Sequence, residues 1–486
     1  MTKLACFSLA VGTLVAAGCR SPDVPDLNNP PIDHVLNNPG RGNVAIAAQG
    51  LLIGARANLA EFNGYVTELG VFGRESYIFD PGDNRFVTEL LNPGGLNGSN
   101  PRFGGNMWTA RYANIRSANL LMRALSAPYA KADSVTTPEK EAVRGFAKTI
   151  QALDFLEIIN TRDTIGAPID VDHGVDTLAP FVPRDQVFDH INTLLEDAQT
   201  HLQAAQAASA AFPFQLTSGF AGFNTPATFL KFNRALKARV QVYRGAIFTD
   251  DFAFIDALNL LADGGATFID TMPGFDLDVG VYHTFGTTSG DITNGLFDPT
   301  PAKLYAHPSL LTDAELQNGS LTALDRRYLA KVRSVTFRSY VGHGSSLGFI
   351  RYASNVAPLP IIRNEELILL RAEANLAEGN FVAAAGDINF IRVNSGGLAP
   401  IDIAPIPLAQ LPDSLLTVLL KEKRYSLLFE GGHRWIDARH YGRLGIEAVP
   451  GPHPLPIDIA GDQIYLLMPV PLDECLPRPA GSRGCP

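Results

Sequence analysis

The pentapeptide Gly344–Gly348 has the spacing of a nucleophile elbow, and it places Ser346 in the position of the attacking serine. Such an elbow requires a strand before the serine and a helix directly after it, because the sharp turn between them exposes the hydroxyl. Here the residues after Gly348 have an extended pattern, and prolines follow at 358 and 360. The sequence therefore favours a turn between two strands, and an exported serine hydrolase that uses Ser346 is kept as an alternative function.

Other residue types that carry out catalysis or hold metals are present without the required spacing. Glu365 and Glu366 are adjacent, so on a helix their side chains point in different directions and do not form a facing pair. The acidic residues at 80–84 do not follow the calcium-loop pattern. His433 and His440 lie two helical turns apart, a separation of about 10 Å that is too large for one metal ion. We predict no catalytic residue, no metal site and no cofactor.

The segment from Arg424 to Arg443 carries a high density of charge among apolar residues. Charges interleaved with core residues predict internal ion pairs, with two parallel hydrogen bonds where an arginine meets a carboxylate. We interpret the segment as architectural; a catalytic cluster is the alternative, and no nucleophile accompanies it. The charged members are Arg424, Glu430, Arg434, Asp437 and Arg439, and the apolar members are Leu427, Leu428, Trp435 and Ile436.

Cys475 and Cys485 lie ten residues apart in a tail that is rich in proline and glycine. In an oxidising compartment such a pair forms a disulfide, and closing a loop of this length contributes about 2–3 kcal/mol. Two free thiols are the alternative. No histidine lies near the pair at the spacing of a zinc site, so we predict the disulfide Cys475–Cys485.

The first residues have the organisation of a secretory signal. Lys3 supplies a positive charge, residues 4–15 are apolar, and small residues at 16–18 lead into Cys19. An apolar run of about 12 residues is too short to span a bilayer. Small residues directly before a cysteine suit a lipoprotein signal peptidase, which leaves that cysteine as an acylated N-terminus. We predict lipidation at Cys19, with an ordinary signal peptide as the alternative.

The predicted signal at 1–18 is followed by a lipidated tether at 19–42, rich in Pro, Asn and Asp, and by one folded region at 43–486. Arg20 follows the cysteine, so the aspartate that retains lipoproteins in the inner membrane is absent. The net charge of −10 argues against a nucleic-acid partner. The hydrophobic fraction of 46% is ample for a packed core. We expect an exported protein that is anchored to the membrane by lipid.

Apolar residues recur at helical spacing in several blocks of the chain. Asp185 is predicted to cap the third block, and Gly379 is predicted to end the fifth in a left-handed turn before the sixth begins. This last pair is similar to a tetratricopeptide hairpin, and the segment 236–261 has the same layout with a break near 249–251. The blocks fall at 108–122, 143–153, 187–202, 229–243, 367–374 and 382–388.

Long stretches without periodicity lie between these blocks, at residues 80–106, 262–310 and 334–360. Loops of this length in a compact chain are usually functional. The sequence therefore predicts a mainly α fold, in which tetratricopeptide-like helix pairs pack against a loop-rich region with few short strands. The helices are expected to act as scaffold and the loops as the working surface.

Taken together, these blocks resemble the SusD/RagB-like surface lipoproteins of nutrient-uptake systems. The segment Phe429–Asp437 departs from the family pattern, because Gly431 and Gly432 both precede His433. The segment 438–440 reads Ala-Arg-His where Leu-Arg-Arg is more usual. The resemblance rests on segments that occur in family order: 108–119, 142–147, 154–155, 183–198, 360–374, 388–392, 423–437 and 468–471.

The resemblance implies a lipoprotein at the surface of the outer membrane, where it would sit as a lid on a SusC-like TonB-dependent transporter. Such a protein captures an oligomeric nutrient, often a glycan and sometimes a peptide, and passes it to the transporter without making or breaking bonds. A purely structural helical-repeat adaptor is a further alternative, because the paired helices alone require no ligand.

Sugar binding uses flat aromatic faces together with amide and arginine groups. In similar proteins the site often draws on the region before the first shared helix and on mid-chain loops, which suggests Tyr77, Asn100, Trp108, Tyr282 and Phe285 as ligand contacts. For Tyr77 and Trp108 the alternative is a core position. For Asn100, which lies among glycines, the alternative is a turn.

Overall fold

A computed structural model describes residues 40–91, 95–99, 105–126, 134–174, 177–445 and 455–485. Cys19, most of the predicted tether, and Asn100 lie outside these ranges. Within the described ranges, none of the helices combines the length and the hydropathy that a membrane span requires.

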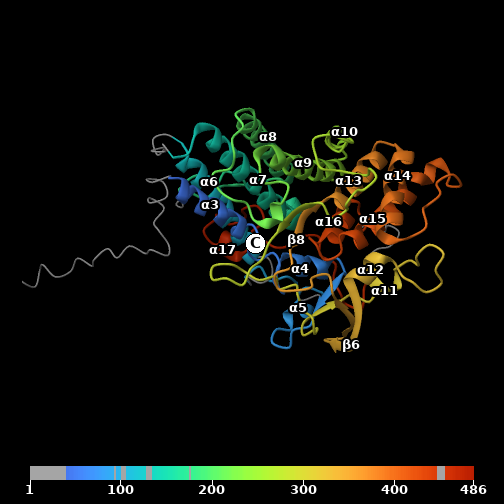
Figure 1. The fold of residues 1–486 in the computed structure, drawn as a ribbon. Coiled ribbons are helices and arrows are strands. Elements are labelled where there is room, and N and C mark those ends of the chain that lie inside the picture. Colours follow the sequence, from blue (N-terminus) through green and yellow to red (C-terminus); the bar gives the residue numbers. More distant parts are fainter. Residues whose placement is uncertain are drawn as a thin grey trace, which may run out of the picture.

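The longer helices lie side by side along one side of the molecule (Figure 1). Consecutive helices pack against each other from α6 to α10, and α13, α14 and α15 continue the layer through α10. The helices are α3 (Arg41–Gly54), α4 (Tyr65–Phe72), α5 (Arg85–Thr88), α6 (Asn106–Ala124), α7 (Thr137–Arg162), α8 (Arg184–Ala207), α9 (Pro226–Phe248), α10 (Asp251–Leu260), α11 (Ser309–Thr312), α12 (Arg326–Lys331), α13 (Asn364–Ala377), α14 (Phe381–Ile391), α15 (Leu411–Ser426), α16 (His433–His440) and α17 (Leu472–Cys475).

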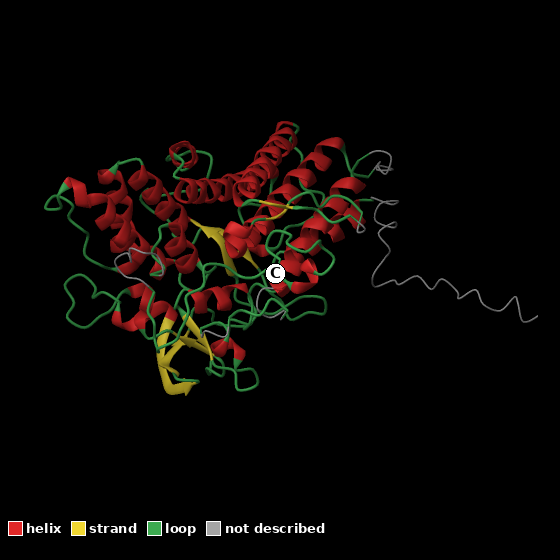
Figure 2. Cartoon of the chain, turned by 180° about the vertical axis from the view of Figure 1, so that it is seen from behind, coloured by secondary structure: helices red, strands yellow, loops and turns green. Residues whose placement is uncertain are grey.

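The strands are short and lie mostly on the opposite side from the helical layer (Figure 2). The described strands pair only in twos, each pair antiparallel: β1 with β5, β2 with β3, β4 with β8, and β6 with β7. This confirms the predicted mainly α fold. The strands are β1 (Ser76–Ile78), β2 (Ala167–Pro168), β3 (Phe181–Val182), β4 (Gly280–His283), β5 (Leu304–Ala306), β6 (Val332–Tyr340), β7 (His343–Phe349) and β8 (Leu359–Arg363).

Local sequence explains where the long helices begin. Before α7, the Thr136 side chain accepts a hydrogen bond from the Glu139 N–H, and the Glu139 carboxylate accepts one from the Thr136 N–H. Thr225 and Thr228 form the same reciprocal pair before α9. Each pair satisfies two backbone donors that have no partner inside the helix. The predicted cap at Asp185 is wrong: the N-cap of α8 is Pro183, and Asp185 lies in the first turn, where its charge faces the positive end of the helix.

Two helix pairs have the predicted hairpin layout. Between α13 and α14 the chain reverses at Gly379, whose φ of 72° is in the left-handed region that suits glycine. Between α9 and α10 it reverses at Thr249, also left-handed with φ 54°, and the Asp250 side chain caps α10 by accepting from the Ala253 N–H. Both breaks fall where the sequence predicted them.

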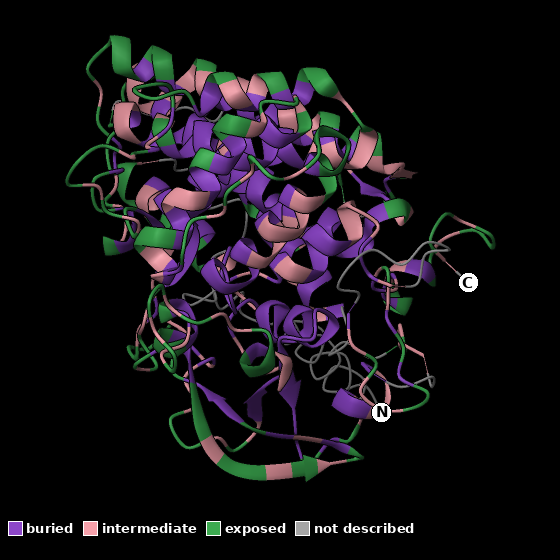
Figure 3. Ribbon diagram, turned by 90° about the vertical axis from the view of Figure 1, so that its right-hand side faces the viewer, coloured by how far each residue is buried: buried purple, intermediate pink, exposed green. Residues whose placement is uncertain are grey.

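The predicted turn at Gly344–Gly348 is wrong in position. The whole pentapeptide lies within β7, and the chain reverses earlier, at Val341 and Gly342, which both have positive φ. Ser346 therefore has strand on both sides, and the strand-turn-helix geometry of a nucleophile elbow is absent. The partner strand β6 is largely exposed along its length (Figure 3).

Cys475 and Cys485 form the predicted disulfide, with their Cα atoms 5.4 Å apart. We expect replacement of both cysteines by serine to destabilise the tail at 472–485 by about 2–3 kcal/mol, because the loop is no longer closed in the unfolded state. Hydrogen exchange should show amide protection in this tail falling by a factor of about 30–160, while α7 keeps its protection. Equal protection of the tail in both proteins would contradict this expectation.

Candidate functional site

Two of the suggested ligand contacts lie in the core. Tyr77 is 2% exposed; its ring stacks on Phe79 with 5.1 Å between centroids, and its hydroxyl donates to Asp458 at 2.9 Å. Trp108 is 3% exposed and its indole N–H donates to Glu474 at 3.3 Å. Both positions agree with the core alternative that the sequence left open.

The mid-chain candidates also have internal partners. Phe285 is buried beneath the Arg56 guanidinium, 5.8 Å from the ring centroid. Tyr282 is half-buried, its hydroxyl donates to the Asp278 carbonyl, and burial raises the pKa of Tyr282 to about 12. The structure does not bring Tyr77, Trp108, Tyr282 and Phe285 together around one opening, and their role in ligand contact stays a prediction.

A cleft of about 670 Å³ opens where α15 and α16 meet α11 and the residues that follow it. Leu455 and Pro456 form part of its apolar wall. Its volume is in the range of sites that enclose small ligands, and charged side chains reach it from three separate segments of the chain. These are Asp313, Glu315, Lys421, Arg424, Arg434, Asp437 and Arg443.

Arg424 is anchored at one side of the cleft. Its Nη1 donates to Asp313 at 2.6 Å and its Nη2 to the Ser309 hydroxyl at 2.7 Å. Although burial alone would raise it, the pKa of the Asp313 carboxyl is held below its usual value by this guanidinium. The Nε of Arg424 is buried without a hydrogen-bond partner among the described residues, and so is Nη1 of Arg443. Two guanidiniums at the cleft therefore have donors to spare.

Among the cations that line the cleft, Arg434 is the one whose charge is least compensated by a carboxylate. Its Nη1 donates to the Arg74 carbonyl at 3.0 Å, and within the described ranges no carboxylate lies at ion-pair distance from it. Burial, and then the neighbouring Arg424, lower the pKa of Arg434 to about 9. A buried positive charge beside another cation favours an anion in the same space. The cleft is thus suited to a carboxylate, sulfate or phosphate group.

The sequence singled out Arg424 and Arg434 for a different reason. The predicted internal ion pair is confirmed for Arg424, which pairs with Asp313, and is wrong for Arg434. The adjoining Glu430 contacts Lys331, Arg351 and Arg363, so the interpretation of this segment as architectural holds for it. What the sequence missed is the open space beside these side chains, because Asp313 and Leu455 reach it from distant parts of the chain.

A second cavity of about 380 Å³ lies between α6, α7 and α8. Part of its polar wall is already paired: Gln151 donates to the Asn119 side chain at 2.6 Å and to the Ile115 carbonyl at 3.1 Å. Because these groups have partners, the cavity offers a ligand fewer free donors than the cleft at α15 and α16. We therefore regard the latter as the candidate site.

One group of described side chains has the composition of a metal site, namely His343, Asp458 and Asp462. This group adjoins the cleft through Arg74. The Arg74 guanidinium donates to the main-chain carbonyl of Pro456, and the main-chain carbonyl of Arg74 accepts from the Arg434 guanidinium. Asp80, in the turn considered above for calcium, pairs with Lys303 at 2.8 Å instead.

No protein-family model matches the chain, and no curated protein matches it by sequence. Solved structures do match. A SusD-like carbohydrate-binding protein from Bacteroides fragilis matches with a TM-score of 0.64 at 14% identity, over 91% of this chain and 98% of its own.

Two further structures agree. Surface glycan-binding protein A from Bacteroides uniformis has a TM-score of 0.64 at 15% identity, over 91% of this chain and 99% of its own. NanU from B. fragilis has a TM-score of 0.61 at 14% identity, over 94% and 99%. At these identities the likeness establishes the fold, and it covers nearly the whole of each chain.

Proposed function

From this SusD-like fold we propose that the chain is a surface lipoprotein which captures an oligosaccharide and passes it to a SusC-like TonB-dependent transporter in the outer membrane. The observation that carries the proposal is the shared fold over more than 90% of this chain with proteins whose names state glycan or carbohydrate binding. The signal-like segment that ends at Cys19 supports the anchoring.

The proposed role is binding without catalysis. Ser346, the residue on which the hydrolase alternative depends, lies within a regular strand. The cleft contains arginines, a lysine and carboxylates, and most of these charges are already paired, either with each other or with charges just outside the cleft. Such an arrangement recognises charge and shape, and it presents no activated nucleophile.

The proposed ligand carries an acidic group, such as a uronic acid carboxylate or a sulfate ester. Arg424, Arg434 and Arg443 line one cleft, and within the described ranges no carboxylate lies at ion-pair distance from Arg434. An acidic sugar would supply oxygen acceptors, and its ring would lie against the apolar wall at Leu455 and Pro456.

Calorimetry with a matched panel of acidic and neutral oligosaccharides tests this assignment. Saturable heat with the acidic members is expected. Lys421 lines the cleft and pairs with Glu315 at 2.9 Å; Lys421→Glu should weaken acidic-ligand binding about tenfold, since it places negative charge at the entrance. The matched control is Lys231→Glu on the exposed face of α9, which should bind as the wild type does.

The outcomes separate the alternatives. Binding of neutral oligosaccharides alone would retain glycan capture and remove the acidic assignment. Saturable heat with none of a broad glycan and peptide panel would favour the helical-repeat adaptor. For the partner, isolation of the chain from detergent-solubilised outer membrane should recover a TonB-dependent transporter, and repeated absence of one would contradict the proposed delivery step.

A further inference from the structure

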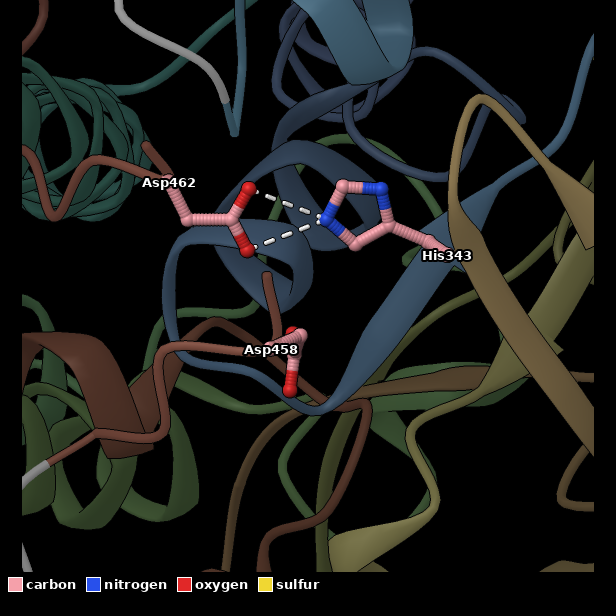
Figure 4. Close-up of side chains that lie close together, drawn as sticks. All are labelled: His343, Asp458 and Asp462. Atoms are coloured by element: carbon pink, nitrogen blue, oxygen red, sulfur yellow. Dashed lines mark hydrogen bonds and ion pairs between the residues drawn. The ribbon is translucent and has the colours of Figure 1, made fainter. Parts of the chain in front are cut away.

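Three side chains with metal-binding chemistry converge from two distant segments of the chain (Figure 4). His343 begins β7, whereas Asp458 and Asp462 belong to the C-terminal segment that starts at 455. One ligand atom from each lies within 4.8 Å of the others. Imidazole nitrogen and carboxylate oxygen are both common ligands of zinc.

The imidazole of His343 has an oxygen acceptor on each side. Its Nδ1 lies 3.2 Å from the Val341 carbonyl oxygen, and its Nε2 lies 3.1 Å and 3.0 Å from the two carboxylate oxygens of Asp462. A neutral imidazole has one N–H, so it can satisfy only one of these contacts. The space between Nε2 and the Asp462 carboxylate therefore suits either an imidazole N–H that points at the carboxylate or a metal ion bound by both groups.

The contact between His343 and Asp462 is buried. The side chains of His343 and Asp462 are both 0% exposed, so water does not stabilise either one. Among the described residues, the other donor to Asp462 is the Ile459 N–H at 3.3 Å, a long contact for a buried carboxylate. The position beside Nε2 of His343 is thus the main contact of the Asp462 carboxylate among the described side chains.

Asp458 is held in place by its own partners. The Tyr77 hydroxyl donates to it at 2.9 Å, and Nε2 of His307 lies 3.0 Å and 3.1 Å from its two oxygens. Because the Ser309 N–H donates to Nδ1 of His307, the His307 proton is on Nε2 and points at Asp458. Groups that orient a carboxylate in this way are typical surroundings of a metal ligand.

The nearby guanidinium of Arg74 directs its hydrogen bonds away from the two carboxylates. Its Nε is 3.8 Å from Asp458, beyond hydrogen-bonding distance, and its donors go to the main-chain carbonyls of Val71, Pro456 and Gln463. It is therefore secured without Asp458, and it offsets at most one of the two carboxylate charges.

We propose that His343, Asp458 and Asp462 bind one zinc ion. The Nδ1–H of His343 would then donate to the Val341 carbonyl and leave Nε2 as the ligand atom, which is the usual arrangement of a zinc-bound histidine. Ligands of a tetrahedral zinc ion are about 3.3 Å apart, close to the His343–Asp462 spacing. The ion would fasten the segment from 455 to the β6–β7 hairpin through three protein ligands. The proposal does not depend on the ligand of the cleft.

The test is metal analysis of the full mature chain after incubation with zinc and removal of free metal. Elemental analysis should find about one zinc ion per chain, and cobalt substituted for zinc should give visible absorption. His343→Gln and Asp462→Asn should each reduce bound zinc at least tenfold. The matched control is His201→Gln, because His201 also contacts a carboxylate, that of Glu141, but has no second carboxylate in a cluster; it should retain the metal.

A chelator should lower the melting temperature of the wild type and of His201→Gln, with recovery on adding zinc, and should leave His343→Gln unchanged. If the two ligand variants fail to fold, the cobalt spectrum of the wild type still decides, as does Asp458→Asn, whose side chain is the most exposed of the three. A folded wild type that takes up neither zinc nor cobalt would overturn the proposal.

Discussion

Replacement of Glu430 by glutamine is expected to lower the free energy of unfolding by about 3–5 kcal/mol. The Glu430 side chain is buried and lies 3.0 Å from Nζ of Lys331, 3.1 Å from Nε of Arg351 and 3.1 Å from Nε of Arg363. Although burial alone would raise it, the pKa of Glu430 is held well below its usual value by Arg363 and Lys331. Glutamine would leave three cations close together without the carboxylate that compensates them.

Equilibrium denaturation by urea at neutral pH measures this effect. The control is Asp189→Asn, because Asp189 pairs with Arg244 at 2.6 Å but has a side chain that is 65% exposed. Exposed pairs contribute about 0–1 kcal/mol, so this variant should unfold nearly as the wild type does. A loss below 1 kcal/mol in Glu430→Gln would show that the surrounding cations find other partners or water.

The helical layer could be predicted from the sequence because its determinants are local. The stripes that correspond to α6, α7, α8 and α9 follow from the spacing of apolar residues within each helix. The reversal at Gly379 follows from the one residue type that adopts a left-handed conformation without strain. The internal ion pairs of Glu430 were also predictable in kind, since charges among core residues need partners.

The aromatic candidates show where one sequence is insufficient. Tyr77 lies on a strand whose three residues are all buried, because β5 pairs with it and His307 and His343 cover its ring. An alternating pattern does not reveal that both faces of a strand are covered. A tyrosine at the same spacing could equally have presented an exposed aromatic face to a sugar.

The cleft and the proposed zinc site were not predictable for a geometric reason. His343 and Asp462 are separated by 119 residues, and Arg424 and its partner Asp313 by 111. Spacing rules detect ligands within one loop or helix. His343 and Asp462 meet only when the C-terminal segment packs on β7, and Arg424 and Asp313 meet only when α15 packs beside the end of α11. The prediction that the chain has no metal site considered only residues close in sequence.

A second large effect is expected in the pH dependence of stability, through His433. Burial lowers the pKa of His433 to about 4, whereas a histidine in an unfolded chain titrates near about 6.5. Between these values the unfolded state binds one more proton than the folded state. The contribution of His433 is therefore fully present above about pH 6.5 and is lost as the pH falls to about 4, a change of about 3 kcal/mol.

Comparison with His433→Gln isolates this contribution. The wild-type curve alone does not, because buried carboxyls act in the opposite sense: burial raises the pKa of Asp154 to about 8 and that of Glu75 to about 7. The variant loses packing at every pH, but its unfolded state has no His433 to protonate. Its deficit in urea denaturation should therefore shrink by about 3 kcal/mol between about pH 7 and about pH 4. A deficit that stays constant over this range would mean that His433 takes up its proton in the folded protein as readily as in the unfolded chain.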